Sequence, residues 1–385
     1  MNSARPRGLA AMLTLALAGT LAITSCSAAG TPDAAAPEQN AGATAAYERW
    51  LQWAAELGFD ASGSVAPSTD ATAEVARLDA ADLAELADAI AAGRADVDRR
   101  TQADDARSTN SAMALGSWLF AAASADRVTE LHDLVPLLEP GAADGLAWER
   151  FDGALEGELS MDDLHQGAAD DCWLLAGLGA VTYSDPGGLA ARIRSNDNGT
   201  ITVRLARDGG ERSVTVSPYL PVREDGALAY AHAASATNAN WSSFVEKAFA
   251  ALPEFGSYAR LAGGSLLAES STSAAASIES VTGGAATTRP GHDVTIEDLR
   301  RARDEGRAVT ATTFLTGLAP EPQPGEVTMV DRHVYVLESV DAETVTLRNP
   351  WGYATSVGGP ETVRLGIADV NRRILVVTFG PPATT

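Results

Sequence analysis

Apolar residues recur along the first part of this chain with the spacing of helices. Between about residues 47 and 135 they follow one another mostly at intervals of three and four. The positions that show this best are Val75, Leu78, Leu83, Leu86, Ala87 and Ile90. Such spacing predicts amphipathic helices, and two more are expected over 111–122 and 128–135, the second ended by Pro136. The sequence therefore predicts a mostly helical region over 46–146.

From about residue 147 the apolar pattern becomes a mixture of helical and strand-like segments, which we treat as one domain over 147–380. Helices are expected over 172–181, 241–252 and 296–305, the last entered through Thr295. Strands are expected over 201–205, 213–216, 308–314, 334–340, 344–348, 362–365 and 373–379. The residues Asp208-Gly209-Gly210 predict a hairpin between the first two strands. Helices followed by a mostly antiparallel sheet indicate an α+β fold.

The N-terminus has the pattern of an export signal. Two arginines precede an apolar run from Leu9 to Ile23 that contains no acidic residue and is too short to predict a spanning helix. The run ends in Ile23-Thr24-Ser25-Cys26, which resembles a bacterial lipobox. We therefore predict a signal peptide with lipobox over 1–26 and a lipid anchor at Cys26, which places the protein at the cell surface or facing the periplasm. Ordinary cleavage after Ala28 or Ala29, which would give a secreted protein, is the alternative.

Residues 27–45 are rich in Ala, Pro, Gly and Thr without apolar periodicity, and they predict a flexible tether. We find no candidate chemistry in the helical region that follows. A pro-segment, an inhibitory cap and an interaction domain stay open as its role.

Charge and cysteine content narrow the function further. The net charge is −23 and Lys247 is the only lysine, so the chain has no basic patch for nucleic acid. It has two cysteines, Cys26 and Cys172. After export, Cys172 would have no partner for a structural disulfide, because Cys26 would carry lipid or be removed. An unpaired thiol in an exported protein needs a function, so Cys172 is a candidate reactive residue.

Three short segments carry candidate chemistry. They are 166–176 around Cys172, 332–336 around His333, and Arg348-Asn349-Pro350-Trp351-Gly352. A thiol nucleophile needs a lowered pKa, which a helix N-terminus and a nearby imidazole can provide. The imidazole needs a partner that fixes its orientation, and the oxyanion needs donors, for which an amide carbonyl and a glutamine side chain suffice. The strands before and after a tight turn at 341–343 would bring His333 and Asn349 to the same end of the sheet.

These segments resemble the calpain family of cysteine peptidases. The first is similar to the family's glutamine-glycine loop followed by Asp-Cys-Trp, and the other two are similar to its histidine strand and its Asn-Pro-Trp-Gly segment. The chain between them also matches in order, through Trp241, Glu246-Lys247-Ala248, Ser257-Tyr258, Leu261, Gly263-Gly264 and Thr282-Gly283-Gly284. The resemblance covers roughly residues 147–380 and implies a papain-like catalytic core of two subdomains.

The resemblance also implies roles for single residues. Cys172 would be the nucleophile, His333 the base and acid, Asn349 the orienting residue and Gln166 the oxyanion donor. Trp351 would shield the bond between His333 and Asn349 from water, and Trp173 would serve both packing and shielding. The implied reaction is hydrolysis of protein or peptide substrates through a thioester acyl-enzyme.

Two residues depart from the family pattern. Asp170 stands where glycine usually precedes Asp-Cys-Trp, and together with Asp171 it should oppose thiolate formation. Arg332 replaces the glycine that commonly precedes the histidine, and could either crowd the cleft or offset the two acids. These departures keep open the alternative of a catalytically weak or inactive lipoprotein that acts as a binding module. A thiol acyltransferase or peptidoglycan amidase is a third hypothesis.

Calcium is a separate question, because the chemistry itself needs no cofactor. The resemblance implies calcium binding by the core, and Asp163 matches one acidic position of such a site. The acidic stretch that usually follows Asn-Pro-Trp-Gly is replaced here by Tyr353-Ala354-Thr355, and no EF-hand loop is present in the sequence. Both calcium-dependent and calcium-independent activity are therefore left open at this point.

Overall fold

The computed structural model describes most of the chain beyond its N-terminus. The described residues are 37–61, 66–101, 110–152, 155, 159–207, 209–262, 273–315, 317–318, 320, 327–353 and 359–383. The predicted signal peptide and the first part of the predicted tether lie outside these ranges, as do Gly263 and Gly264. Within the described residues, no helix combines the length and the apolar character needed to cross a membrane.

The N-terminal region is helical, as predicted. Its elements are α1 (Pro37–Glu56), α2 (Thr69–Arg77), α3 (Ala80–Thr101), α4 (Asn110–Ala122), α5 (Ala125–Leu134) and the 3-10 helix η1 (Pro136–Leu138). Leu83, Leu86 and Ile90 of α3 are buried in a core of their own with residues of α4 and α5. Helix α1 begins earlier than expected, so the last part of the predicted tether, 37–45, is helical. The alanine content of this stretch and Pro37 at the first helical position both favour that outcome.

The middle of the molecule is a mostly helical unit with two small sheets. Its elements are β1 (Ala147–Arg150), η2 (Met161–Asp163), α6 (Cys172–Ser184), α7 (Pro186–Ala190), β2 (Ile193–Ser195), β3 (Ile201–Arg207), β4 (Gly210–Val216), β5 (Tyr219–Val222), α8 (Trp241–Ala250), η3 (Tyr258–Arg260) and α9 (Ala274–Thr282). Strand β1 pairs with β5, and β2, β3 and β4 form an antiparallel sheet. Helix α6 is buried over its first eleven residues, which fits a helix that is apolar on all sides.

The C-terminal unit is a six-stranded antiparallel sheet. Its elements are β6 (Thr287–Pro290), η4 (Gly291–Asp293), α10 (Ile296–Asp304), β7 (Val309–Thr313), β8 (Val334–Val340), β9 (Thr344–Arg348), β10 (Thr362–Gly366), α11 (Ile367–Arg373) and β11 (Ile374–Phe379). The strand order is β10-β9-β8-β7-β11-β6. An α+β fold with a helical N-terminal region is thereby confirmed.

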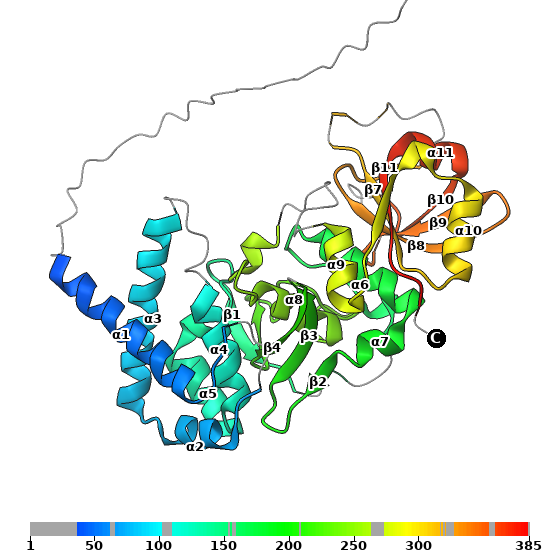
Figure 1. Cartoon of the computed structure of the whole chain (residues 1–385). Helices are drawn as coiled ribbons and strands as arrows, with labels where there is room; N and C mark the ends of the chain where they lie inside the picture. Colours follow the sequence, from blue (N-terminus) through cyan, green and yellow to red (C-terminus); the bar gives the residue numbers. More distant parts are fainter. Residues whose placement is uncertain are drawn as a thin grey trace, which may run out of the picture.

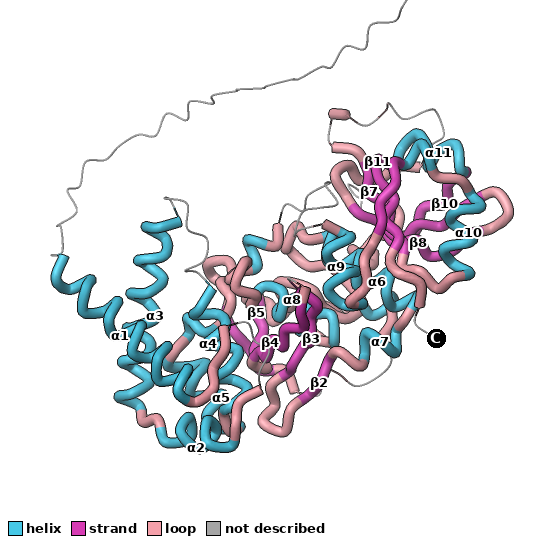
Figure 2. The backbone as a smooth tube through the Cα atoms, in the orientation of Figure 1, coloured by secondary structure: helices cyan, strands magenta, loops and turns pink. Residues whose placement is uncertain are grey.

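The three parts follow one another along the molecule in chain order. Figure 1 shows the helical region at one end, the unit around α6 and β3 in the middle, and the six-stranded sheet at the other end. In Figure 2 the strands form two separate groups on either side of α6 and α9. Helix α6 packs against β8 and β7 of the large sheet. This contact places the N-terminus of α6, where Cys172 lies, beside the start of β8.

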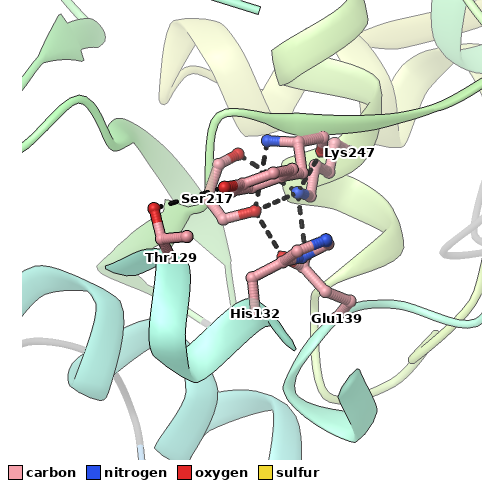
Figure 3. A network of polar contacts seen from close by, with 6 residues as sticks. Thr129, His132, Glu139, Ser217 and Lys247 are labelled. Atoms are coloured by element: carbon pink, nitrogen blue, oxygen red, sulfur yellow. Dashed lines mark hydrogen bonds and ion pairs between the residues drawn. The ribbon is translucent and has the colours of Figure 1, made fainter. Parts of the chain in front are cut away.

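The helical region is fixed to the middle unit by a buried polar network. His132 of α5 stacks on Tyr219 of β5 with ring centroids 3.7 Å apart, and its Nδ1 lies 3.0 Å from Oε1 of Glu139. The Lys247 ammonium group of α8 lies 2.8 Å from the other oxygen of Glu139. Figure 3 shows these side chains converging from α5, the segment after η1, and α8, with Ser217 between them. The helical region is therefore packed as an integral part of the folded chain.

Candidate active site

The hairpin of β8 and β9 brings His333 and Asn349 together. His333 is the residue before β8, and Asn349 is the residue after β9. The two strands are antiparallel, and their turn is closed by a hydrogen bond from the Asp341 amide to the Thr344 carbonyl oxygen, 2.8 Å long. At the other end of the hairpin, Nε2 of His333 donates to Oδ1 of Asn349 at 2.8 Å. With Nε2 carrying its proton, Nδ1 keeps the lone pair that a general base needs.

Aromatic rings enclose this imidazole. The Trp351 ring lies 5.1 Å from the His333 ring, centroid to centroid, and the Tyr335 ring is equally far at a nearly perpendicular angle. The Trp351 amide also donates to Oδ1 of Asn349 at 3.0 Å, so the asparagine oxygen is held from two sides. His333 is 3% exposed and Asn349 is fully buried. The bond between the two side chains is thus kept away from water.

A tight turn after Trp351 depends on glycine. Gly352 has a φ of +72°, which L side chains rarely adopt, and a Cβ there would lie 2.4 Å from Nδ1 of His165. His165 itself stacks on His232, with ring centroids 5.6 Å apart. The histidine next to Gln166 therefore packs against the Asn-Pro-Trp-Gly segment and supports its conformation.

Cys172 lies at the N-terminus of α6, beside the same hairpin. Its sulfur accepts a hydrogen bond from the backbone amide of Val334, the residue after His333. Burial raises the pKa of the Cys172 thiol to about 12, with Asp171 and Asp170 adding to the rise, and burial lowers the pKa of His333 to about 4. We expected the helix N-terminus to lower the thiol pKa; the loss of solvation outweighs that effect. Both shifts favour a neutral thiol and a neutral imidazole in the free protein near pH 7.

Gln166 is buried next to the other two segments. Its backbone amide donates to the Pro350 carbonyl oxygen at 2.9 Å, and its side-chain Nε2 donates to the Ala169 carbonyl oxygen at 2.6 Å. Gly167 follows, and a Cβ there would lie 2.3 Å from the carbonyl oxygen of Tyr230. The loop into α6 is thus anchored to the Asn349 segment, and the second N–H of the Gln166 amide is left to serve another acceptor.

Arg348 forms ion pairs with both the middle unit and the C-terminal sheet near this site. Nη1 of Arg348 lies 2.5 Å from Asp162 in η2, and Nη2 lies 2.8 Å from Glu361 next to β10. Arg348 directly precedes Asn349. The chain that carries Asn349 is therefore attached to the loop that leads toward Gln166.

The two departures from the family pattern pair with each other. Nη2 of Arg332 donates to Oδ2 of Asp170 at 2.6 Å, although the residues are 162 positions apart. Among the described residues, Arg332 is the one non-glycine residue with positive φ, at 51°. Of the two outcomes expected for Arg332, this contact matches the offset of the acids near Cys172.

Loss of the ion pair between Arg332 and Asp170 is expected to slow the alkylation of the Cys172 thiol. Both side chains are about half exposed, so Arg332→Gln should change the free energy of unfolding by less than about 1 kcal/mol. Asp170 raises the pKa of Cys172, and without Arg332 its charge is uncompensated. We expect alkylation of Cys172 near neutral pH to be about threefold slower in Arg332→Gln, and Asp170→Asn to remove that effect in the double variant. Faster alkylation in Arg332→Gln would contradict the offset.

Two further predicted residues are placed as follows. Trp173 is 1% exposed, packs on Phe249 and Phe255, and donates from Nε1 to the Leu261 carbonyl oxygen at 2.9 Å. These contacts show that Trp173 packs in the core. A role in shielding the catalytic residues from water stays a prediction. Asp163 is exposed, and its carbonyl oxygen accepts a hydrogen bond from Nδ2 of Asn240.

Calcium binding at Asp163 stays a prediction from the resemblance. Calcium takes six to eight oxygen ligands, several of them carboxylates. Within the described residues, no group of three or more His, Cys, Asp or Glu side chains is arranged to hold a metal ion. The neighbouring Asp162 is engaged by Arg348.

Two buried acidic residues, Glu139 and Glu246, have partners that the sequence pattern did not predict. Glu139 pairs with Lys247, and Asp171 lies against Glu246 of α8. The available signal was the pair Glu246-Lys247 in a helix without a polar face, because charged residues in such a helix must have partners. Which residues these partners are follows only from the tertiary structure.

Comparison of the sequence with known proteins shows which family this chain belongs to. The profile of the calpain family of cysteine proteases matches residues 145–360, which is more than half of the chain and includes Gln166, Cys172, His333 and Asn349. The chain belongs to the calpain family of cysteine proteases. Similar curated proteins include mouse calpain-8, 26% identical over 243 residues, and the human calpain-1 catalytic subunit, 34% identical over 139 residues.

The likeness to these calpains is partial. The matched segments cover 56% and 31% of this chain, but only 32% of calpain-8 and 18% of the calpain-1 catalytic subunit. The chain thus spans about a third or less of the length of the calpains that it matches. Cysteine protease ancestry is shown at the level of the family, and α1 to α5 lie before the matched segment.

Proposed function

We propose that this protein is a cysteine endopeptidase that uses Cys172, His333 and Asn349. The observation that carries the proposal is the 2.8 Å bond between His333 and Asn349, formed beside a sulfur that contacts the Val334 amide. That bond fixes the imidazole and leaves Nδ1 available as a base. The family membership agrees with this chemistry, and the substrate class that it implies is protein or peptide.

The reaction would run in two halves. As the sulfur attacks the peptide carbonyl, Nδ1 of His333 takes the thiol proton and then gives it to the departing amine. The oxyanion would be bound by the backbone N–H of Cys172 at the start of α6 and by the Gln166 amide. Water, deprotonated by His333, then cleaves the thioester and restores the thiol. Trp351 keeps the imidazole–amide bond dry throughout.

A weakly active or inactive binding protein is the competing function. The burial of Cys172, which is 6% exposed, and its high thiol pKa favour this alternative, because both disfavour the thiolate. A peptidoglycan amidase would use the same residues on cell-wall peptides. The competing functions differ in their products and in whether the thiol can be acylated.

The test is cleavage of an unfolded protein substrate, with products identified by mass spectrometry. We expect internal peptide-bond cleavage that is lost in Cys172→Ser, and labelling of Cys172 by an irreversible epoxide inhibitor of papain-like peptidases. Parallel arms with calcium, with a chelator and with cell-wall peptides separate the alternatives. Release of cell-wall fragments alone would favour the amidase, and absence of both cleavage and labelling would favour the binding protein.

We further propose export and a lipid anchor at Cys26, on the strength of the N-terminal pattern alone. The protein would then act at the cell surface or facing the periplasm. Metabolic labelling with a fatty acid is expected to mark the wild type and not Cys26→Ala, which should be released in soluble form. A soluble, unlabelled wild type would favour cleavage after Ala28 or Ala29.

A further inference from the structure

Two buried carboxyl groups meet directly behind the nucleophile. Asp171 is the residue before Cys172, Glu246 lies in α8, and both are fully buried. One Glu246 oxygen accepts from the Ala231 amide at 2.8 Å. Its other oxygen has no N–H or hydroxyl donor among the described residues, and Asp171 has none beyond its own backbone amide. The two carboxyl groups lie close enough to affect each other's pKa, so one of them can donate to the other once it is protonated.

A hydrogen bond between two carboxyl groups needs a proton. Carboxylates accept only, and two of them side by side in a buried place cannot both be charged. Burial raises the pKa of Asp171 to about 7 and that of Glu246 well above its ordinary range. The pair therefore titrates as a unit that keeps at least one proton at neutral pH.

We propose that Asp171 and Glu246 share one proton and together act as positioning residues for Cys172. The shared proton joins the start of α6 to α8, and it leaves one negative charge instead of two beside the thiol. The inference rests on the proposed role of Cys172 as the nucleophile, because neither carboxyl group touches the substrate. Its function is to keep the thiol in place and to set the pH at which the thiol can react.

Other titratable groups surround the pair but do not replace the proton. Asp170 lies on the same loop and is paired with Arg332. The rings of Tyr230 and Tyr258 stack at 3.8 Å beside Glu246, and the Tyr258 hydroxyl has no partner among the described residues. The negative charge of Glu246 raises the pKa of both tyrosines, after the larger effect of burial. Among the described residues, no cationic side chain contributes to the pKa shift of either carboxyl group, so a second charge on the pair would lack direct compensation.

Loss of the shared proton should change the reactivity of Cys172. As the pH rises, the pair gains a second negative charge, which raises the thiol pKa further and opposes attack. Glu246→Gln provides an isosteric donor that does not titrate. Its amide can donate to Asp171 while its oxygen accepts from Ala231, so the pair carries no more than one negative charge, however far the pH rises.

The first measurement detects the proton itself. Infrared spectra of the wild type near pH 8, above the pKa of about 7 of Asp171 and where exposed carboxyl groups are ionised, are expected to contain the carbonyl band of one protonated carboxyl group. The band should disappear in Glu246→Gln and persist in the exposed control Glu224→Gln. Asp171→Asn, in which the amide donates to Glu246, is the second variant and should also lose the band. A wild type without the band would overturn the proposal, whatever the variants do.

The second measurement follows the thiol. The rate of Cys172 alkylation in Glu246→Gln, divided by that of the wild type, is expected to be near one in acid and to rise to about tenfold above pH 8. A ratio that is the same at every pH would contradict the charge effect, since a merely structural role would not follow pH. Neither readout needs peptide turnover, so failure of the peptidase proposal would be distinguished from failure of this one.

Discussion

His333→Ala is expected to lower kcat/KM for peptide hydrolysis by about 1,000-fold and to abolish epoxide labelling of Cys172. The reason is the buried thiol. With a pKa of about 12, very little of the Cys172 thiol is ionised at neutral pH without a base. His333 supplies that base at the moment of attack, through Nδ1. The measurement combines steady-state kinetics with intact-mass analysis of the labelled protein.

A matched control separates the base from its orientation. Asn349→Ala removes the acceptor that holds Nε2 of His333 but keeps the imidazole, so we expect a smaller loss than in His333→Ala and residual labelling. In the wild type, activity should rise with pH through about 4, because burial lowers the pKa of His333 to about 4 and only the neutral ring can act as a base. Equal labelling of wild type and His333→Ala would remove His333 from the mechanism.

The sequence predicted best where local pattern and tertiary environment agree. Strands 334–340 and 344–348 were predicted to the residue, because their β-branched and aromatic side chains fit a buried sheet and a short turn joins them. That hairpin was enough to predict the contact between His333 and Asn349. Helices α9 and α11 were missed, since a run of small residues and a seven-residue segment between strands have little apolar periodicity.

The electrostatics of the site could not be predicted in the same way. The direction of the Cys172 pKa shift depends on how deeply tertiary packing buries the sulfur, and the helix position alone suggested the opposite sign. The pairing of Arg332 with Asp170 joins residues 162 positions apart, and that of Asp171 with Glu246 depends on how α6 meets α8. The spacing of residues along the chain does not predict such long-range contacts. The presence of charged residues in apolar segments indicated only that they need partners.

Substitution of Lys247 is expected to cause a large loss of stability. Its ammonium group is fully buried and donates to the Tyr219 carbonyl oxygen at 2.6 Å and to Ser217 Oγ at 2.8 Å, and it pairs with Glu139 (Figure 3). Burial alone would raise the pKa of Glu139, but Lys247 lowers it below its ordinary value. Lys247→Met leaves the Glu139 charge buried without its cation. We expect the free energy of unfolding to fall by about 3–5 kcal/mol, as measured by urea denaturation.

The effects of Lys247 and Glu139 substitutions on the free energy of unfolding should not be additive. Lys247→Met and Glu139→Gln are each expected to be strongly destabilising, and the double variant less so than their sum, because it leaves no unpaired charge. The exposed pair Arg300–Glu297 is the control, and Glu297→Gln should cost under about 0.5 kcal/mol. The Glu139 contribution is present above its unfolded pKa and is lost as the pH falls through the lower folded value, so wild type and Glu139→Gln should converge in acid.

This pair also tests the role of the helical region. Glu139 precedes the segment that matches the calpain family, and His132 of α5 contacts both Glu139 and Tyr219. Removal of the chain before residue 147 would therefore leave Lys247 with no carboxylate, and the fragment is expected to be as unstable as Glu139→Gln or more so. A stable and active fragment would instead identify the helical region as a removable pro-segment. If the fragment is unfolded, residues 46–146 are required for the folding of the catalytic unit, as α6 and β8 are.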